Sequence, residues 1–467
     1  MLKFLPLGKD FDKIKEYLAL CDGEICDLTL GVRFMWRDEF KIDYAIYNHT
    51  LIMYQKSKDG TNGFYYPIGK DHEGAILEIE KYSRAKFLPL SYCCLTNEQA
   101  EFLKNRYFDC ESTISRDWCD YIYDAENFKS YSGKKFSGQR NHYNKFKKLY
   151  PDYIYKNIEE SDYEGIKTFL YEYEKSRTYD SWSERVEKDK VFELIENMER
   201  FNQVGGLIKV GEKVIAISVG EIVGQTLVVH TEKALKEYAG VYPTMAHEFA
   251  KANAKEKVKF INREEDCGIT GLRISKTQYH PIKLQEKVFL SVKTLISKIQ
   301  PFSQIKADCL IIRELQLKEA ESYKNLYLDD NLNKWWGYDY REDLANQTPS
   351  AEYFFNFQNL LKKKGEEFSF AVLNDDELVG ELVLHNFDYF GGLEIGFRFF
   401  KEHQGKGYAT ISASALIEYA KKVLGAKTIK SRCYKENLPS RKLIERLGLK
   451  LTHENDTHYF FSQDLNN

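Results

Sequence analysis

One order of apolar and amphipathic segments occurs twice along this 467-residue chain, and the repetition limits the folds open to it. In residues 205–264, the apolar runs GGLIKVG, KVIAISVGEIV and QTLVVHTEK precede the amphipathic segment VYPTMAHEFAKANA and a further apolar run, VKFINRE. In residues 367–434, the runs EFSFAVLN, ELVGELVLHNF and GLEIGFRFF precede the helix-patterned ATISASALIEYA and the run TIKSRCY. Strand-like runs that alternate with helical periodicity predict mixed sheets whose central strands lead into helices.

A further unit precedes these two. Residues 40–69 predict a strand hairpin with its turn at residues 59–63, residues 97–108 predict a helix, and residues 112–124 predict a closing strand. A chain of this length exceeds what a single core supports. We therefore expect three α+β or α/β units at residues 1–130, 131–299 and 308–467, with the polar, proline-containing residues 300–307 as a linker.

The composition argues against several classes of protein. With 43% hydrophobic and 30% charged residues, the chain is expected to be a soluble globular protein, and its net charge of −3 disfavours general nucleic-acid binding, which depends on neutralising phosphates. No apolar stretch is long enough for a membrane helix. The nine cysteines contain no CxxC pair, which favours a reducing, cytoplasmic location over disulfides or zinc. We expect no bound metal ion and no membrane partner.

A glycine-containing loop, QGKGYAT, stands between the third apolar run and the helix of the last unit. The first amides of a helix have no backbone acceptor and lie at the positive end of the helix dipole, so they attract anions. Gly405 and Gly407 carry no side chain that would block this approach, and Gly407 can adopt a positive φ. The loop predicts a phosphate site, although glycines also precede helices for purely steric reasons.

This loop and a later motif together resemble the GNAT superfamily of N-acyltransferases. The family signature is Q/R-x-x-G-x-G/A, followed by N-x-x-S/A and by a helix that ends in an L-G-F-like sequence. The corresponding residues here are Gln404, Gly407, Ala409, Asn437, Ser440, Leu447, Gly448 and Leu449. The resemblance covers residues 308–467 and implies the acyl-CoA N-acyltransferase fold, acetyl-CoA as donor, and a small-molecule or peptide primary amine as acceptor.

The resemblance also implies roles for individual residues. Asn437 would contact the pantetheine arm of CoA. The diphosphate site would be formed by the loop residues Gln404, Gly405, Lys406, Gly407, Tyr408, Ala409 and Thr410.

Attack of an amine on a thioester needs a base for the ammonium proton and an acid for the departing thiolate. Glu394, in the strand before the loop, is the candidate base, directly or through water, with a solvated strand residue as the alternative interpretation. Many GNAT relatives carry a tyrosine seven residues after the motif asparagine, where this chain has Ile444. Tyr434 and Ser440 are therefore the candidate acids, and support of its own helix turn is the alternative role for Ser440.

The segment LYLDDNLNKWWGYDYREDL lies where GNAT enzymes form one wall of the acceptor groove. Trp335 and Trp336 stand near Asp329, Asp330 and Asp339, a combination that suits a cationic amine. The two indoles would serve equally well as packing anchors.

Charged residues gather in two segments before residue 300. Residues 129–150 contain seven Lys or Arg and no acid, which predicts either a solvated basic helix face or a grip on a phosphate backbone that includes Arg140 and His142. In residues 260–281 an apolar run leads directly into charges of both signs, a pattern typical of a site at the end of a strand. These charges include Arg263, Glu264, Asp266, Arg273 and Lys276.

These segments resemble the family that shares the C-terminal domain of phosphatidylglycerol lysyltransferases. The family's marks appear here as Arg140-Asn141-His142, as His230-Thr231-Glu232-Lys233, and as residues 262–276. The resemblance spans nearly residues 1–295 and implies two tandem GNAT-like folds, related to the Fem peptidyltransferases, whose donor is an aminoacyl-tRNA. Lipid-modifying members also carry a membrane domain that this sequence does not contain, so a lipid acceptor is not expected.

The second unit has no complete glycine loop where its central strand leads into its helix. Only Gly240 remains, Glu237 stands where Gln or Arg is wanted, and Pro243 removes one amide donor. This unit is therefore expected not to bind CoA.

The favoured hypothesis is an N-acetyltransferase that moves an acetyl group from acetyl-CoA to a primary amine, while the N-terminal units recognise the acceptor or catalyse a second acyl transfer. An alternative is an aminoacyl-tRNA-dependent aminoacyltransferase with an accessory GNAT unit. A third, non-enzymatic hypothesis has the glycine loop bind CoA as a sensor.

Overall fold

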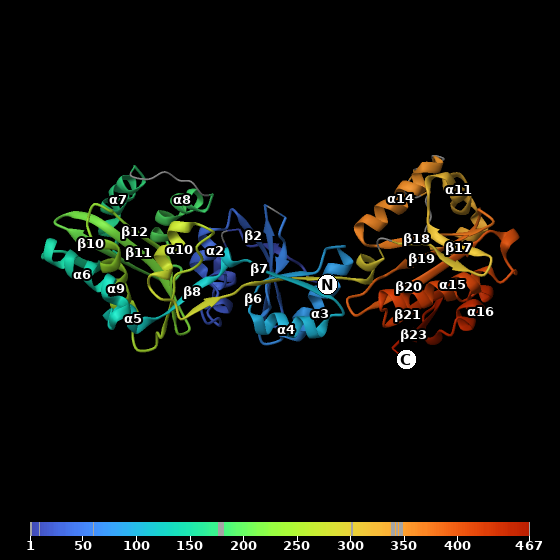
Figure 1. The fold of residues 1–467 in the computed structure, drawn as a ribbon, viewed down its shortest axis with the longest axis horizontal. Helices are drawn as coiled ribbons and strands as arrows, with labels where there is room; N and C mark the ends of the chain where they lie inside the picture. Colours follow the sequence, from blue (N-terminus) through green and yellow to red (C-terminus); the bar gives the residue numbers. More distant parts are fainter. Residues whose placement is uncertain are drawn as a thin grey trace. The chain divides into compact units, whose positions relative to one another are not determined.

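The computed structural model describes residues 2–466 apart from Lys9, Asp59, 176–181, 300–301, 338–340, 342–343 and 345–348. The strands form three mixed sheets, each flanked by helices, which confirms the expected fold class (Figure 1). Contacts divide the chain into an N-terminal unit, residues 1–102 with 112–291, and a C-terminal unit, residues 103–111 with 292–467. Among the described residues, no helix combines the length and the apolar sequence that crossing a membrane requires.

The first sheet contains the predicted hairpin and one further turn that the sequence did not reveal. Within the N-terminal unit its strands follow the order β1 (Leu5–Pro6), β2 (Phe40–Tyr47), β3 (Thr50–Ser57), β4 (Gly63–Phe64), β6 (Ser91–Leu95) and β15 (Val288–Val292). The chain reverses between β2 and β3 at Asn48 and His49, with φ of 46° and 58°. The chain reverses again between β3 and β4, which pair antiparallel through Tyr54 and Phe64, so the reversal predicted around residues 59–63 is confirmed. The turn at Asn48 and His49 was missed by sequence reasoning, because two consecutive left-handed residues suffice to close a tight hairpin and Asn adopts that conformation readily.

The second sheet takes a strand from the region assigned to the first unit. Its order is β14 (Lys283–Gln285), β8 (Asp120–Asp124), β13 (Phe260–Asn262), β12 (Thr226–Ala234), β11 (Lys213–Val223), β10 (Gln203–Val210) and β9 (Ile154–Asn157). β8 precedes residue 130 yet pairs with β13 and β14, whereas β15 follows the second sheet and pairs with β6 in the first. The two halves thus exchange strands, and the expected boundary at residue 130 does not separate the sheets.

One hydrophobic core joins both sheets of the N-terminal unit. It includes Met53 from β3 and Leu227 from β12, both buried. Helices α6 (Ser137–Leu149), α7 (Tyr163–Lys175) and α9 (Val241–Asn253) contribute Phe146, Phe169 and Phe249 to the same core. The exchange of strands and the shared core make the two halves one structural unit.

The third sheet carries the C-terminal unit. Its order is β16 (Ile305–Ala307), β17 (Leu310–Glu314), β18 (Glu367–Asn374), β19 (Glu377–His385), β20 (Gly392–Phe399), β21 (Thr428–Tyr434), β23 (His458–Asp464) and β22 (Lys450–Glu454). β16 lies inside the expected linker 300–307, so that segment is partly a sheet edge, and residues 300–301 fall outside the described residues. β18, β19, β20 and β21 match the predicted apolar runs closely.

Alternation along these strands gives the third sheet two different faces. Phe370, Leu382 and Ile395 belong to a core with α15 (Tyr408–Tyr419). The opposite face is covered in part by α11 (Ala320–Leu328) and α14 (Ala351–Lys364), which contribute Tyr327 and Phe354 to a smaller core (Figure 1). The remainder of this second face is polar and lines a groove.

The sheet opens where β20 and β21 separate. These parallel strands pair only over Gly392–Glu394 and Thr428–Lys430, although both continue for several residues. Backbone pairing ceases at Glu394, and a wedge forms between the two strands. The glycine loop and α15 follow directly from β20, so the end of the wedge faces the loop.

Candidate functional site

A groove of about 1450 Å³ runs from the glycine loop along the wedge. Its wall includes most of the loop, the start of α16 (Leu438–Arg446), and groove-facing residues of β19, β20 and β21. Glu394, Tyr434, Asn437 and Ser440 all line it. These four residues, which the sequence analysis singled out, are spread over more than forty positions of the chain. The structure brings them together in one groove.

The backbone of the loop is shaped for an anion. Gly405 and Gly407 have φ of 76° and 82°, a region that favours glycine, and nothing lies within 4 Å of a Cβ placed on Gly405. Within the described chain, no protein group accepts a hydrogen bond from the amides of residues 405–410, and the next amide, that of Ile411, donates to the Gly407 carbonyl at 3.0 Å. Free amides at a helix start are suited to a diphosphate.

Side chains of the loop and of α16 add positive charge at this end of the groove. Lys401, Lys442 and Arg446 are exposed and line it, and Lys406 is an exposed residue of the loop itself. Gln404 instead donates from Nε2 to the Phe399 carbonyl at 2.9 Å, which ties the loop to the end of β20. Lys401, Lys442 and Arg446 were missed by sequence reasoning, because single lysines or arginines on a helix face carry no distinctive pattern.

Asn437 has a structural task beside its expected one. Its Oδ1 accepts from the backbone amide of Ser440 at 3.2 Å and caps α16, which leaves its side-chain NH₂ for a ligand. Ser440 joins this cap through its backbone, so its hydroxyl stays separate from the cap. Ile444 is fully buried in the core.

Glu394 is held by three neighbours at the other end of the groove. Its Oε2 accepts from Asn386 Nδ2 at 2.9 Å, and its Oε1 lies 3.4 Å from Nε of Arg432 and 4.0 Å from Nε2 of His385. Burial lowers the pKa of His385, Glu394 raises it and Arg432 lowers it, with a net lowering. Sequence reasoning missed His385, which shares this site only through strand pairing.

A second carboxyl faces the groove from β18. Burial, together with the charge of Glu381, raises the pKa of Glu367 to about 7. Glu381 itself is fully buried, where it accepts from Arg398 Nε at 2.7 Å and from the Tyr323 hydroxyl. Glu367 was not predicted either, because a glutamate at the start of a strand is usually solvated.

The tryptophan segment binds the protein's own cations. The guanidinium of Arg398 lies between the rings of Tyr327 and Trp336, at 3.9 and 4.5 Å from their centroids, and the ammonium of Lys334 lies 4.5 Å from the Trp335 ring. Asp329 caps α12 (Asp330–Asn333), and Asp330 pairs with Arg341. Asp339 lies outside the described residues. Both indoles still line the groove.

The N-terminal unit has its own cavity, of about 1630 Å³. It is lined by His142, Glu232, Lys233, Arg263, Glu264 and Lys276 among the predicted residues. Arg263 donates to Glu232 at 3.0 Å and stacks on Tyr279, and Lys233 pairs with Glu187 at 2.9 Å. Lys276 donates to the carbonyls of Arg263 and Glu265.

The other predicted residues of this unit lie beside the cavity. Asp266 is buried and accepts from Arg273 through Nε at 3.0 Å and NH2 at 2.8 Å, which closes the turn before α10 (Thr270–Thr277). Arg140 donates to the carbonyls of Tyr131 and Gly133 and thereby holds the start of α6. These three residues shape the site without lining it.

A buried histidine connects two carboxylates at the floor of this cavity. His230 lies 2.7 Å from Glu264 through Nδ1 and 3.0 Å from Glu221 through Nε2. Burial alone would lower its pKa, but the hydrogen bonds to Glu221 and Glu264 raise it to about 9. Glu264 has a φ of 56°, a strained conformation for glutamate that is typical of functional positions.

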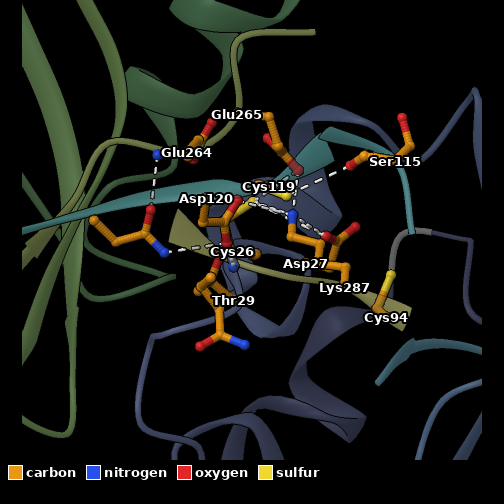
Figure 2. Close-up of polar contacts among 12 residues, drawn as sticks. Cys26, Asp27, Thr29, Cys94, Ser115, Cys119, Asp120, Glu264, Glu265 and Lys287 are labelled. Atoms are coloured by element: carbon orange, nitrogen blue, oxygen red, sulfur yellow. Dashed lines mark hydrogen bonds and ion pairs between the residues drawn. The ribbon is translucent and has the colours of Figure 1, made fainter. Parts of the chain in front are cut away.

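Lys287 forms the centre of a second buried cluster, which the sequence did not reveal (Figure 2). Its Nζ lies 2.6 Å from Asp27, 2.9 Å from Asp120 and 3.3 Å from the Cys26 sulfur, and it also contacts Glu265. Burial raises the pKa of Asp120 to about 7. Cys26, Glu264 and Glu265 are close enough to share a metal ion, but the Lys287 ammonium already contacts two of these three groups.

Helix α9 of the N-terminal unit starts differently from α15. A Cβ on Gly240 would lie 2.3 Å from the carbonyl oxygen of His142 in α6. Glycine is required here because the two helices pack closely. The absence of CoA binding by this unit stays a prediction.

Comparison with known proteins shows which families the two parts of the chain match. Residues 19–290 match the family described as phosphatidylglycerol lysyltransferase, C-terminal, and residues 310–450 match the family described as acetyltransferase (GNAT) domain. The chain belongs to the phosphatidylglycerol lysyltransferase C-terminal family, and its last third is a GNAT-type N-acetyltransferase domain. A GNAT domain implies an acyl-CoA donor and an amine acceptor, and the free amides of the loop fit such a donor.

Individual relatives agree with this division. The uncharacterized N-acetyltransferases YnaD and YjdG of Bacillus subtilis are 32% and 35% identical over 30% and 23% of this chain, and over 79% and 68% of their own lengths. A conserved protein of unknown function from Bacteroides thetaiotaomicron is 26% identical, with a TM-score of 0.59 over 63% of this chain and 100% of its own.

Proposed function

We propose that the C-terminal domain transfers an acetyl group from acetyl-CoA to a primary amine. The observation that carries the proposal is the row of uncapped amides at residues 405–410, which opens onto the wedge between β20 and β21. The diphosphate binds these amides, the exposed basic residues offset its charge, and the pantetheine arm passes the Asn437 side-chain NH₂. The thioester then reaches the point where the strands separate.

The reaction needs the acceptor on the other side of the thioester. There the groove is lined by Asp329, Glu367 and Glu394, so negative charge favours a cationic amine, which must lose a proton before it attacks. The hydroxyls of Tyr434 and Ser440 line the same groove and are the donors that we assign to protonation of the departing thiolate.

Calorimetry with acetyl-CoA tests the donor site. The substitution Gly407→Glu places a carboxylate and a strained backbone at the amide row, and we expect acetyl-CoA to bind at least tenfold more weakly. Gly211→Glu is the matched control, because Gly211 also has a positive φ, of 58°, with nothing within 4 Å of its Cβ position. Absence of binding heat in the unmodified protein would refute the proposal.

A second candidate function concerns the N-terminal unit, for which we propose aminoacyl transfer from an aminoacyl-tRNA. Helix α6 contains no acid, exposes Lys145 and Lys148, and places Gly138, Gln139 and His142 in the wall of the cavity. A basic helix beside a cavity of this size suits an acceptor stem whose end enters the cavity.

Filter binding of deacylated tRNA tests this second function. Replacing Lys145 and Lys148 by Glu should weaken binding at least tenfold and reduce its dependence on salt, because two phosphate contacts become repulsive. The control replaces Lys255 and Lys257, two exposed lysines outside α6, by Glu. Equal losses in both double variants would indicate non-specific attraction and contradict the proposal.

A further inference from the structure

Three ionisable side chains form a row across the third sheet. Glu367 in β18 pairs with His385 in β19, and His385 pairs with Glu394 in β20. Directly paired residues of antiparallel strands project from the same face, and all three line the groove. The row ends at Glu394, the last residue of β20 that pairs with β21. It therefore reaches the place where a thioester enters the wedge.

A slot lies beside His385 at this place. A Cβ on Gly396 would stand 3.8 Å from Nε2 of His385 and 3.4 Å from the ring of Trp336. The backbone of Gly396 is ordinary strand, so the conformation alone does not require glycine. What glycine provides is free space between the imidazole and the indole, two residues beyond the last pair of β20 and β21.

The charges around the row favour the histidine as the proton acceptor. Groups that face His385 come from three elements: Glu367 from β18, Glu394 from β20 and Arg432 from β21. Glu394 has one oxygen on Asn386 and the other near Arg432, so both of its oxygens already face donors of the protein. Burial lowers the pKa of His385, so its imidazole is uncharged near neutral pH and keeps a lone pair.

We propose that His385 is the catalytic base of the C-terminal domain and that Glu394 is a positioning residue. This assignment rests on the proposed acetyl transfer. The acceptor ammonium passes one proton to Nε2 of His385, and the nitrogen lone pair forms the bond to the thioester carbonyl carbon. The carbon–sulfur bond breaks with its electron pair on sulfur. The hydroxyl of Tyr434 or Ser440 gives its proton to sulfur and takes up the second proton from nitrogen, which yields the amide and the CoA thiol, and the imidazolium releases its proton to solvent.

Thiol release from acetyl-CoA with n-butylamine as the probe amine tests the assignment. His385→Gln should lower the rate about a hundredfold or more and remove the acidic limb of the pH profile, while the acetyl-CoA Kd stays within about twofold. Glu394→Gln should retain measurable activity and move the acidic limb to lower pH, because the carboxylate raises the pKa of His385. His453→Gln, an exposed histidine outside the groove, is the matched control.

Two outcomes overturn the inference and a third concerns only the proposed function. Unchanged kinetics in His385→Gln, or a larger loss in Glu394→Gln than in His385→Gln, would show that His385 is not the base. Failure of the unmodified protein to bind acetyl-CoA would instead refute the acetyltransferase proposal itself.

If n-butylamine is not an acceptor, a measurement that needs no turnover tests the assignment of His385 as the base. The ring signals of His385, assigned by their loss in His385→Gln, are titrated by NMR in the acetyl-CoA complex. We expect a midpoint below the ordinary value of 6.5 and a further decrease in Glu394→Gln. A midpoint above 6.5, or one that does not respond to Glu394→Gln, contradicts the inference.

Discussion

Individual residues of this protein derive their chemistry from partners distant in sequence. His230 is the plainest case, because Glu221 and Glu264 reach it from a neighbouring strand and from the loop after β13. Its pKa of about 9 in the folded state exceeds its ordinary value of 6.5. A raised histidine pKa contributes stability that is complete below about pH 6.5 and disappears as the pH rises through about 9.

Hydrogen exchange of a peptide that covers β12 measures this contribution. We expect the opening free energy of the unmodified protein to fall by about 3 kcal/mol between the two pH limits, since one pKa unit corresponds to about 1.4 kcal/mol. His230→Gln should be less stable at pH 6.5 and should lack this pH dependence. His49→Gln, in the exposed β2–β3 turn, serves as the control. An equal pH dependence in both variants would contradict the assignment.

The sequence predicted site residues that share a local motif and missed those that meet through strand pairing. Gly405, Gly407 and Asn437 stand in contiguous patterns whose physical purpose can be stated from helix geometry alone. His385 and Glu367 are adjacent only because β18 and β19 align in one register, and no local pattern encodes that register. Lys287 similarly meets Asp27 and Asp120 from distant parts of the chain.

At the scale of elements, the residue that caps α16 has two roles. Asn437 caps the helix through its oxygen and also lines the groove. Asn437→Ser retains a capping oxygen and removes the NH₂, whereas Asn437→Ala removes both. The two substitutions therefore separate helix stability from ligand binding.

We expect Asn437→Ala to lower the free energy of unfolding of the C-terminal unit by about 1 kcal/mol and Asn437→Ser to lower it only slightly. Both should weaken acetyl-CoA binding to the same extent, because both lose the amide donor. Chemical denaturation and calorimetry of the two variants check this. Unweakened binding in Asn437→Ser would show that Asn437 acts only as a cap.

Strands and helices of the C-terminal unit were predictable because each is a single apolar run between polar turns. β18, β19 and β20 lie where the runs predicted them, and the helix after the glycine loop is α15. The β2–β3 turn was missed because Asn48 and His49 interrupt the run less visibly than the glycine-containing residues 59–63, where the chain reverses between β3 and β4. Elements follow from local periodicity, whereas a tight turn depends on two dihedral angles that many residues can adopt.

For the whole molecule, the sequence indicated tandem units but not how they interlock. Periodicity identifies a strand without naming its partner, so β8 and β15 were assigned to the halves nearest in sequence. In the structure each joins the other sheet, and one core spans both halves. The family match over residues 19–290 covers both halves together, as a single inseparable unit would require.

The position of β15 has a consequence for synthesis on the ribosome. The first sheet has β6 ready once about a hundred residues have emerged, yet the partner of that strand is Val288–Val292. Until translation has passed that point, the edge of β6 is open and the nascent chain must keep it from pairing with other polypeptides. The amino-terminal half is thus synthesised first, but its sheet is completed only after most of the N-terminal unit has been translated.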